Sequence, residues 1–132
     1  MLRLENKVAV ITGGAAGIGK ASVEKFVSEG AKVAIWDVNE EAGQELVSKY
    51  PDTTVFIKVD TSNPVSVEKA TAETVAKFGT IDILINNAGI TRDATIKKMT
   101  FEQWEQVISI NLTGVFNCIK NVSPIMIEKE GG

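Results

Sequence analysis

A glycine-rich turn near the N-terminus has the residue types and spacing of a phosphate-binding loop. The apolar run Lys7–Thr12 stops at Gly13, and a helical pattern begins at Gly17. Gly13 would allow a sharp turn, Gly17 would let a pyrophosphate approach the backbone, and Gly19 would let the helix pack closely on the strand. Unpaired N–H groups and the dipole at a helix N-terminus favour negative charge. The turn therefore predicts dinucleotide binding, with a plain structural turn as the alternative. The expected contact residues are Gly13, Ala16, Gly17, Ile18 and Gly19.

Acidic residues end the next two strand-like runs. Asp37 follows the apolar run 32–36, and its carboxylate would accept hydrogen bonds from the adenosine ribose and repel a 2′-phosphate. This charge favours NAD over NADP, unless Asp37 only begins the next turn. Asp60 follows the run 54–59 and either lies beside the adenine or caps the turn before Asn63. The contact residues expected at these two strand ends are Asp37, Val38, Asp60 and Thr61.

Two further sites carry amide side chains. Asn86 and Asn87, with Gly89, follow the apolar run 81–85, where they can stabilise a turn and line a cofactor crevice. Asn111 lies within the last helical pattern, where a polar residue facing a groove is the simpler interpretation. The contact residues expected after the run 81–85 are Asn87, Ala88 and Gly89.

The elements that must position these residues alternate along the chain. Alternation of strands and helices predicts an α/β fold with a parallel sheet, right-handed crossovers and helices on both faces. Flavodoxin-like and Rossmann-like windings both fit the pattern. The expected strands are 7–12, 32–36, 54–59 and 81–85. The expected helices are 17–28, 40–50, 64–78 and one that starts at Thr100 with a capping box to Gln103. Pro124 should end or kink that last helix.

Composition excludes several classes of function. The 132 residues include no His and one Cys, Cys118, which excludes His-dependent catalysis, an internal disulfide and a zinc or iron–sulfur site. A net charge of −3 does not favour nucleic acid or an anionic membrane. No run approaches the ~20 apolar residues of a membrane span, and residues 1–7 do not resemble a signal peptide. A cytoplasmic protein is expected.

These motifs together resemble the short-chain dehydrogenase/reductases, and bacterial 3-oxoacyl-[acyl-carrier-protein] reductases in particular. The resemblance rests on Thr12–Gly19, Asp37, Asp60, Asn86–Gly89 and Asn111–Gly114, with Thr91 and Met99–Thr100. It implies a three-layer Rossmann-like fold with strand order 3-2-1-4, a nicotinamide cofactor, and hydride transfer between a carbonyl and an alcohol. Asn111 matches the catalytic Asn of the family, which helps hold a water-linked proton relay.

The rest of the family's catalytic set has no match in this sequence. The family uses a Ser and a Tyr-x-x-x-Lys pair, whereas Tyr50 is the only tyrosine and residue 54 is Thr. We therefore expect residues 1–132 to form the N-terminal half of an NAD-binding domain, inactive alone. The alternative is a half-domain, truncated or engineered, that folds without catalysis. An apolar fourth strand at the sheet edge and a wide apolar stripe on the last helix predict self-association.

Overall fold

A four-stranded parallel sheet forms the centre of the computed structural model, which describes residues 1–132. The strands lie in the order β3-β2-β1-β4, which confirms the predicted winding. The strands are β1 (Val8–Thr12), β2 (Lys32–Asp37), β3 (Thr54–Lys58) and β4 (Ile83–Ile85). The helices are α1 (Gly17–Ser28), α2 (Glu40–Lys49), α3 (Pro64–Phe78), α4 (Phe101–Ile108) and α5 (Gly114–Glu128), with the π-helical turn η1 (Ser109–Thr113) between the last two.

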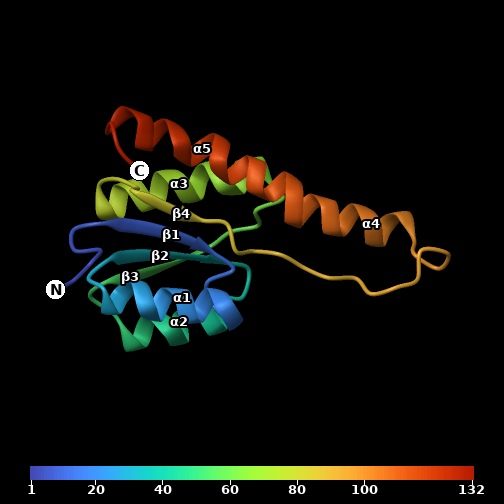
Figure 1. The fold of residues 1–132 in the computed structure, drawn as a ribbon, viewed down its shortest axis with the longest axis horizontal. Coiled ribbons are helices and arrows are strands. Elements are labelled where there is room, and N and C mark those ends of the chain that lie inside the picture. The colour runs from blue at the N-terminus through green and yellow to red at the C-terminus, as the bar shows by residue number, and fades with distance from the viewer.

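Helices cover both faces of the sheet. Figure 1 shows α1 and α2 on one face and α3 with α5 on the other. A hydrophobic core lies on each face of the sheet, and β1 contributes side chains to both. Ala9 and Ile11 pack with Val23 of α1, whereas Val10 packs with Val122 of α5. All five residues of β1 are buried, as expected for a central strand of a parallel sheet.

Strand β4 is shorter than the predicted run 81–85. The carboxylate Oδ2 of Asp82 accepts a hydrogen bond from the Val8 N–H at 2.9 Å, in place of a backbone carbonyl. The ion pair between Asp82 and Lys129 ties this position to the end of α5. Asp82 is therefore an anchor that joins the beginning of β1, the beginning of β4 and the last helix.

The last helix is longer and less regular than the sequence indicated. The capping box of Thr100 and Gln103 is present, and the helical chain then runs through η1 into α5 without a break. Of the two outcomes predicted for Pro124, an end of the helix is wrong, because α5 continues to Glu128, and a kink stays a prediction. Val122 and Cys118 are fully buried against the sheet, and this packing outweighs the hydrogen bond that proline cannot donate.

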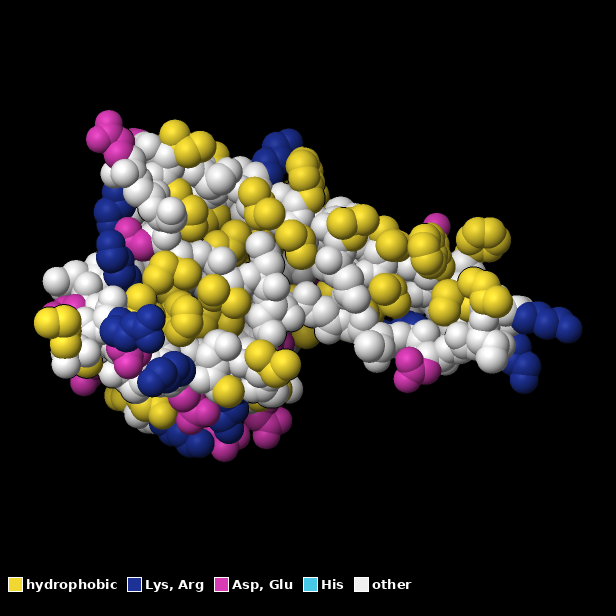
Figure 2. All heavy atoms as spheres, in the orientation of Figure 1, with side chains coloured by type: hydrophobic (Ala, Val, Ile, Leu, Met, Phe, Trp, Pro, Cys, Tyr) yellow, Lys and Arg dark blue, Asp and Glu magenta, His cyan; other side chains and the backbone are white.

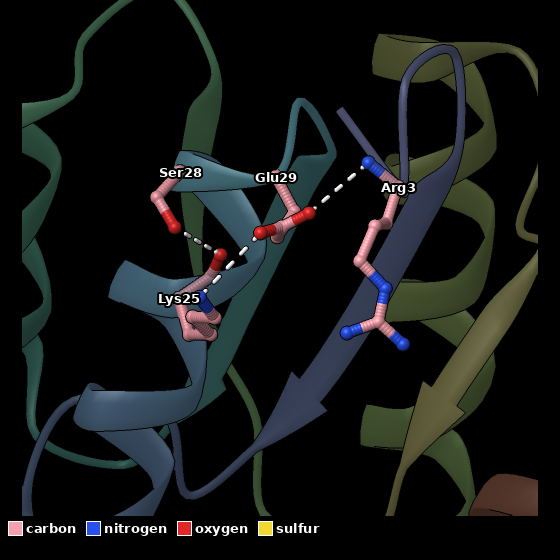
Figure 3. A network of polar contacts seen from close by, with 4 residues as sticks. All are labelled: Arg3, Lys25, Ser28 and Glu29. Atoms are coloured by element: carbon pink, nitrogen blue, oxygen red, sulfur yellow. Dashed lines mark hydrogen bonds and ion pairs between the residues drawn. The ribbon is translucent and has the colours of Figure 1, made fainter. Parts of the chain in front are cut away.

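A small polar network fixes the N-terminal segment to the end of α1 (Figure 3). Glu29 accepts a hydrogen bond from the Arg3 N–H at 3.0 Å and pairs with Lys25 at 3.4 Å. Ser28 donates to the Lys25 carbonyl at 2.6 Å. The Arg3 N–H, followed by Lys25, holds the pKa of Glu29 below its ordinary value. The network lies away from the carboxyl ends of the strands, so its role is structural.

Apolar side chains remain exposed where the chain extends beyond the sheet. The segment after β4 and helix α4 project from the rest of the molecule, and hydrophobic side chains are visible along this projection (Figures 1 and 2). Exposed large apolar residues of this projection include Ile96, Phe101 and Trp104, and Leu112 of η1 and Phe116 of α5 are also exposed. None of the helices is both long and apolar enough to cross a membrane.

Candidate functional site

A cavity of about 380 Å³ opens where the strands end at their carboxyl edge. Most of the predicted contact residues line it, which brings four separate parts of the sequence to one place. These residues are Gly13, Ala16, Gly17, Asp37, Val38, Asp60, Thr61, Asn87, Ala88 and Gly89. Apolar residues that the sequence did not single out complete the lining: Trp36, Val59, Ile90 and Ile110.

The N-terminus of α1 faces this cavity without a side-chain cap. Ala16 occupies the N-cap position and accepts no hydrogen bond with its side chain, whereas Asn39, Asn63 and Thr100 cap the N-termini of α2, α3 and α4. Gly17 has φ +57°, and a Cβ added there would meet nothing within 4 Å. The first turn of α1 is therefore open to an anion, and its backbone conformation suits glycine.

Gly19 and Ile18 lie in α1 but do not line the cavity. A Cβ added to Gly19 would lie 2.0 Å from the carbonyl oxygen of Gly13, so α1 can approach the turn only with glycine at this position. The Ile18 side chain is largely exposed. Gly19 therefore allows α1 to pack closely on the glycine turn, and Ile18 could contact a ligand in the cavity only through its backbone.

Asp37 links the glycine turn to the end of β2. Its Oδ2 accepts a hydrogen bond from the Ala15 N–H at 3.0 Å, and its Oδ1 accepts one from the Asn39 N–H at 3.0 Å. Asp37 therefore holds its own turn and also lines the cavity, a geometry compatible with both interpretations of this residue. A carboxylate that accepts two backbone N–H bonds retains lone pairs for further donors.

Asp60 also serves its own turn while it lines the cavity. Its Oδ1 accepts hydrogen bonds from the N–H and the hydroxyl of Ser62, at 3.0 and 2.6 Å. Asn63, not Asp60, caps α3, with its side chain accepting from the N–H groups of Val65 and Ser66. The carboxylate thus shapes the turn that presents Thr61 to the cavity.

A buried threonine joins the two turns that flank the cavity. The Thr12 hydroxyl oxygen accepts hydrogen bonds from the N–H groups of Asn87 and Ala88, both at 3.0 Å. The Asn87 side chain donates to the Gly13 carbonyl at 3.2 Å. Thr12 was part of the glycine motif but not an expected contact, and nothing in its local sequence indicates that its hydroxyl serves residues 75 and 76 positions away.

The second amide of the Asn86–Asn87 pair lies elsewhere. Asn86 lines a groove of about 420 Å³ between β4 and α5, together with Leu84, Ile119 and Met126. Only Asn87 faces the cavity at the sheet edge. Consecutive residues leaving a strand point in opposite directions, which separates the two amides.

Asn111 lies in the π turn η1 and is exposed. Its Oδ1 accepts from the Ile90 N–H at 2.8 Å, and its Nδ2 donates to the Ile90 carbonyl at 2.9 Å. A π turn inside a longer helix is often found at functional sites. Here it presents one amide that holds the wall of the cavity beside Gly89.

Neither the one cysteine nor the one tyrosine supplies a reactive side chain to the cavity. Burial raises the pKa of Cys118 to about 11, so its thiol stays protonated near neutral pH. The Tyr50 hydroxyl donates to Glu24 at 3.4 Å and is not among the cavity residues. No group of three or more His, Cys, Asp or Glu side chains is placed to hold a metal ion.

Comparisons with known proteins agree on one family. A family model described as short chain dehydrogenase matches residues 7–132. A 3-oxoacyl-[acyl-carrier-protein] reductase from Thermotoga maritima is 41% identical over 134 residues, covering 99% of this chain and 54% of that protein. Secoisolariciresinol dehydrogenase from Forsythia intermedia is 41% identical over 133 residues, covering 98% and 48%.

A solved structure carries the same arrangement. The 3-ketoacyl-(acyl-carrier-protein) reductase from Brucella melitensis, complexed with NADH, superposes with a TM-score of 0.93 at 31% identity, over 96% of this chain and 52% of that one. The chain thus spans about half the length of the relatives it matches. The family model, the sheet order and the motifs around the cavity all lead to one conclusion: this chain belongs to the short-chain dehydrogenase family.

Proposed function

We propose that the cavity binds the adenosine side of a nicotinamide dinucleotide, as the N-terminal half of an NAD(H)-dependent short-chain oxidoreductase. The observation that carries this proposal is the uncapped N-terminus of α1, where Gly17 leaves open space in front of unpaired N–H groups. A pyrophosphate supplies the negative charge and the acceptors that such a helix end lacks. The reductase that this chain resembles was solved with NADH, which supports the same class of ligand.

Asp37 supports NAD over NADP. Its carboxylate lines the cavity beside the glycine turn, where it would accept hydrogen bonds from ribose hydroxyls and repel a 2′-phosphate. Asp37→Asn keeps an oxygen that can accept from the Ala15 N–H but removes the charge. We expect the ratio of NADPH affinity to NADH affinity to rise in this variant, and an unchanged ratio would contradict the assignment.

The proposed reaction is hydride transfer between the nicotinamide and a carbonyl/alcohol pair, of the 3-oxoacyl-[acyl-carrier-protein] reductase type. Its support is the sequence likeness to reductases of that name. In this proposal Asn111 fixes Ile90 and so holds the wall next to the proton relay. Since residues 1–132 contain no Tyr-x-x-x-Lys, we propose that they bind cofactor without turning it over.

Calorimetry with NADH tests the binding directly. We expect weak, saturable binding by the wild-type chain and no sustained NADH oxidation when a small ketone is added. In Gly17→Ala the added Cβ stands where the pyrophosphate approaches, so affinity should fall by more than about tenfold. Gly79→Ala is the matched control, because Gly79 also has a positive φ (+87°) and open space around it, so it carries the same backbone strain away from the cavity. Equal affinity in wild type and Gly17→Ala would overturn the proposal, and sustained turnover would refute inactivity.

A second proposal concerns assembly. The exposed apolar side chains of the last helix include Leu112 and Phe116, and β4 is an edge strand beside an apolar groove. We propose that this region self-associates, which also fits the alternative of a half-domain that folds without catalysis. Light scattering after size-exclusion chromatography should give a mass above that of one chain. A monomer at high micromolar concentration would contradict it, and Phe116→Glu should shift an oligomer towards monomer.

A further inference from the structure

The loop that forms the β3 side of the cavity is held by α5, which lies on the same face of the sheet as α3. Asn117 of α5 donates a hydrogen bond from Nδ2 to the carbonyl oxygen of Thr61 at 2.8 Å. Both residues are buried, and Asn117 is only 5% exposed. A buried amide hydrogen bond between residues 56 positions apart specifies where this loop must lie.

The same loop touches α5 at a second point. A Cβ added to Gly114 would lie 2.8 Å from the Thr61 hydroxyl oxygen and 3.4 Å from the Thr61 carbonyl carbon. The helix backbone therefore approaches the loop as closely as a residue without a side chain permits. A polar bond at Asn117 and a close contact at Gly114 fix Thr61 from two neighbouring positions of one helix.

Two amides of one continuous helical segment thus reach two segments of the cavity lining. Asn111 in η1 binds the backbone of Ile90 after β4, and Asn117 in α5 binds the backbone of Thr61 after β3. Ile90 and Thr61 both line the cavity. The Asn117 side chain does not line it, so it acts on any ligand only through Thr61.

We propose that Asn117 is a positioning residue that sets the affinity of the site for the adenine end of its ligand, by holding Thr61 in place. The proposal rests on the proposed function, because it assumes that the dinucleotide places its base against the Asp60–Thr61 turn. It predicts that substitution of Asn117 leaves the affinity for the pyrophosphate end, which would bind at the glycine turn, unchanged.

The test compares two ligands on Asn117→Leu, which keeps the volume of the side chain and removes the donor. Affinity for ADP-ribose should fall about tenfold, in line with the loss of a buried hydrogen bond, while the affinity for inorganic pyrophosphate stays the same. Binding of either ligand can be followed by the changes in NMR chemical shift of the backbone amides in the glycine turn. Thr71→Val, which removes a buried hydroxyl bond within α3, is the matched control and should change neither. An equal loss for both ligands, or no loss, would overturn the proposal.

Two further measurements keep the inference separate from the proposed function. Asn117→Asp retains the shape but faces the Thr61 carbonyl with an acceptor, and it should weaken ADP-ribose binding further. In the ligand-free chain, hydrogen exchange at the Ser62 and Asn63 amides should quicken in Asn117→Leu and not in Thr71→Val. Unchanged exchange in Asn117→Leu would contradict the positioning role of Asn117, whether or not the wild type binds a ligand. Failure of the wild type to bind either ligand would instead refute the proposed function.

Discussion

The two walls of the cavity are built in different ways. The wall from β1 and β2 holds itself together, since the Asp37 carboxylate binds the Ala15 N–H across 22 residues within one strand–helix–strand unit. The wall from the ends of β3 and β4 is held by side chains of a distant helical segment, Asn111 and Asn117. The first wall is a local motif, and the second depends on how the last helix packs.

The glycine turn and the rest of the site are therefore held in place by different contacts. Changes at the first wall should act on folding and phosphate binding together, because the turn is packed against α1. Changes that loosen the last helix should weaken the second wall while the glycine turn persists. The Thr12 hydroxyl lies at the junction, with one residue of the first wall accepting from two residues of the second.

The largest effect should come from Gly19→Ala. The new Cβ would lie 2.0 Å from the Gly13 carbonyl oxygen, so the turn and α1 must separate. We expect the free energy of unfolding to fall by about 3 kcal/mol, the upper range for overpacking, with loss of dinucleotide binding. Urea denaturation measures the first quantity. A loss below about 1 kcal/mol would show that the first wall is not the rigid unit described above.

Thr12→Val should have the next largest effect. The substitution keeps the shape of a buried side chain but removes the acceptor of the Ala88 N–H and leaves the Asn87 N–H only its bond to the Ile85 carbonyl at 3.1 Å. We expect a loss of about 2 kcal/mol in the free energy of unfolding and faster exchange of these two amides. Unchanged exchange at Asn87 and Ala88 would mean that the two walls are joined by other contacts. Thr12→Ser, which restores the hydroxyl, should recover most of the exchange protection.

Asp82→Asn should have a smaller effect, and one that depends on pH. Burial alone would raise the pKa of Asp82, but hydrogen bonds from Lys129 and the Val8 N–H hold it below the ordinary 3.8. A lowered pKa in the folded chain means that the ionised carboxylate stabilises the fold above pH 3.8, and that this contribution is lost as pH falls further. We expect Asp82→Asn to cost about 1.5 kcal/mol at pH 7.

The pH dependence distinguishes this anchor from a general loss of packing. The difference in stability between wild type and Asp82→Asn should shrink as pH falls below about 4, as protonation of Asp82 removes the same interaction in the wild type. Thermal melts at pH 7 and pH 3 measure it. A difference that stays constant with pH would contradict the role of the ionised carboxylate.

From the sequence, the residues that form the first wall could be predicted almost completely, and those that form and hold the second wall only in part. The bounds of α1 and the meeting of Gly17, Asp37 and Asn87 at one edge follow from short-range patterns and from parallel topology. The order of the strands does not follow from the pattern and is predicted only from the resemblance to the family. The roles of Thr12 and Asn117 could not be predicted, because each depends on a backbone group far along the chain. The π turn and the continuation through Pro124 are likewise set by packing of α5 on the sheet, not by local propensity.

A titration of the isotope-labelled chain with NAD⁺, followed residue by residue by amide NMR, tests the central claim most directly. The account predicts saturable shifts confined to the glycine turn, 13–19, and to the other residues that line the cavity: 36–38, 59–61, 87–90 and Ile110. The largest shifts should occur at Gly17 and its neighbours, where the pyrophosphate meets the helix N-terminus. Absence of shifts at saturating NAD⁺, or shifts confined to the exposed apolar residues of the projecting helix, would contradict it.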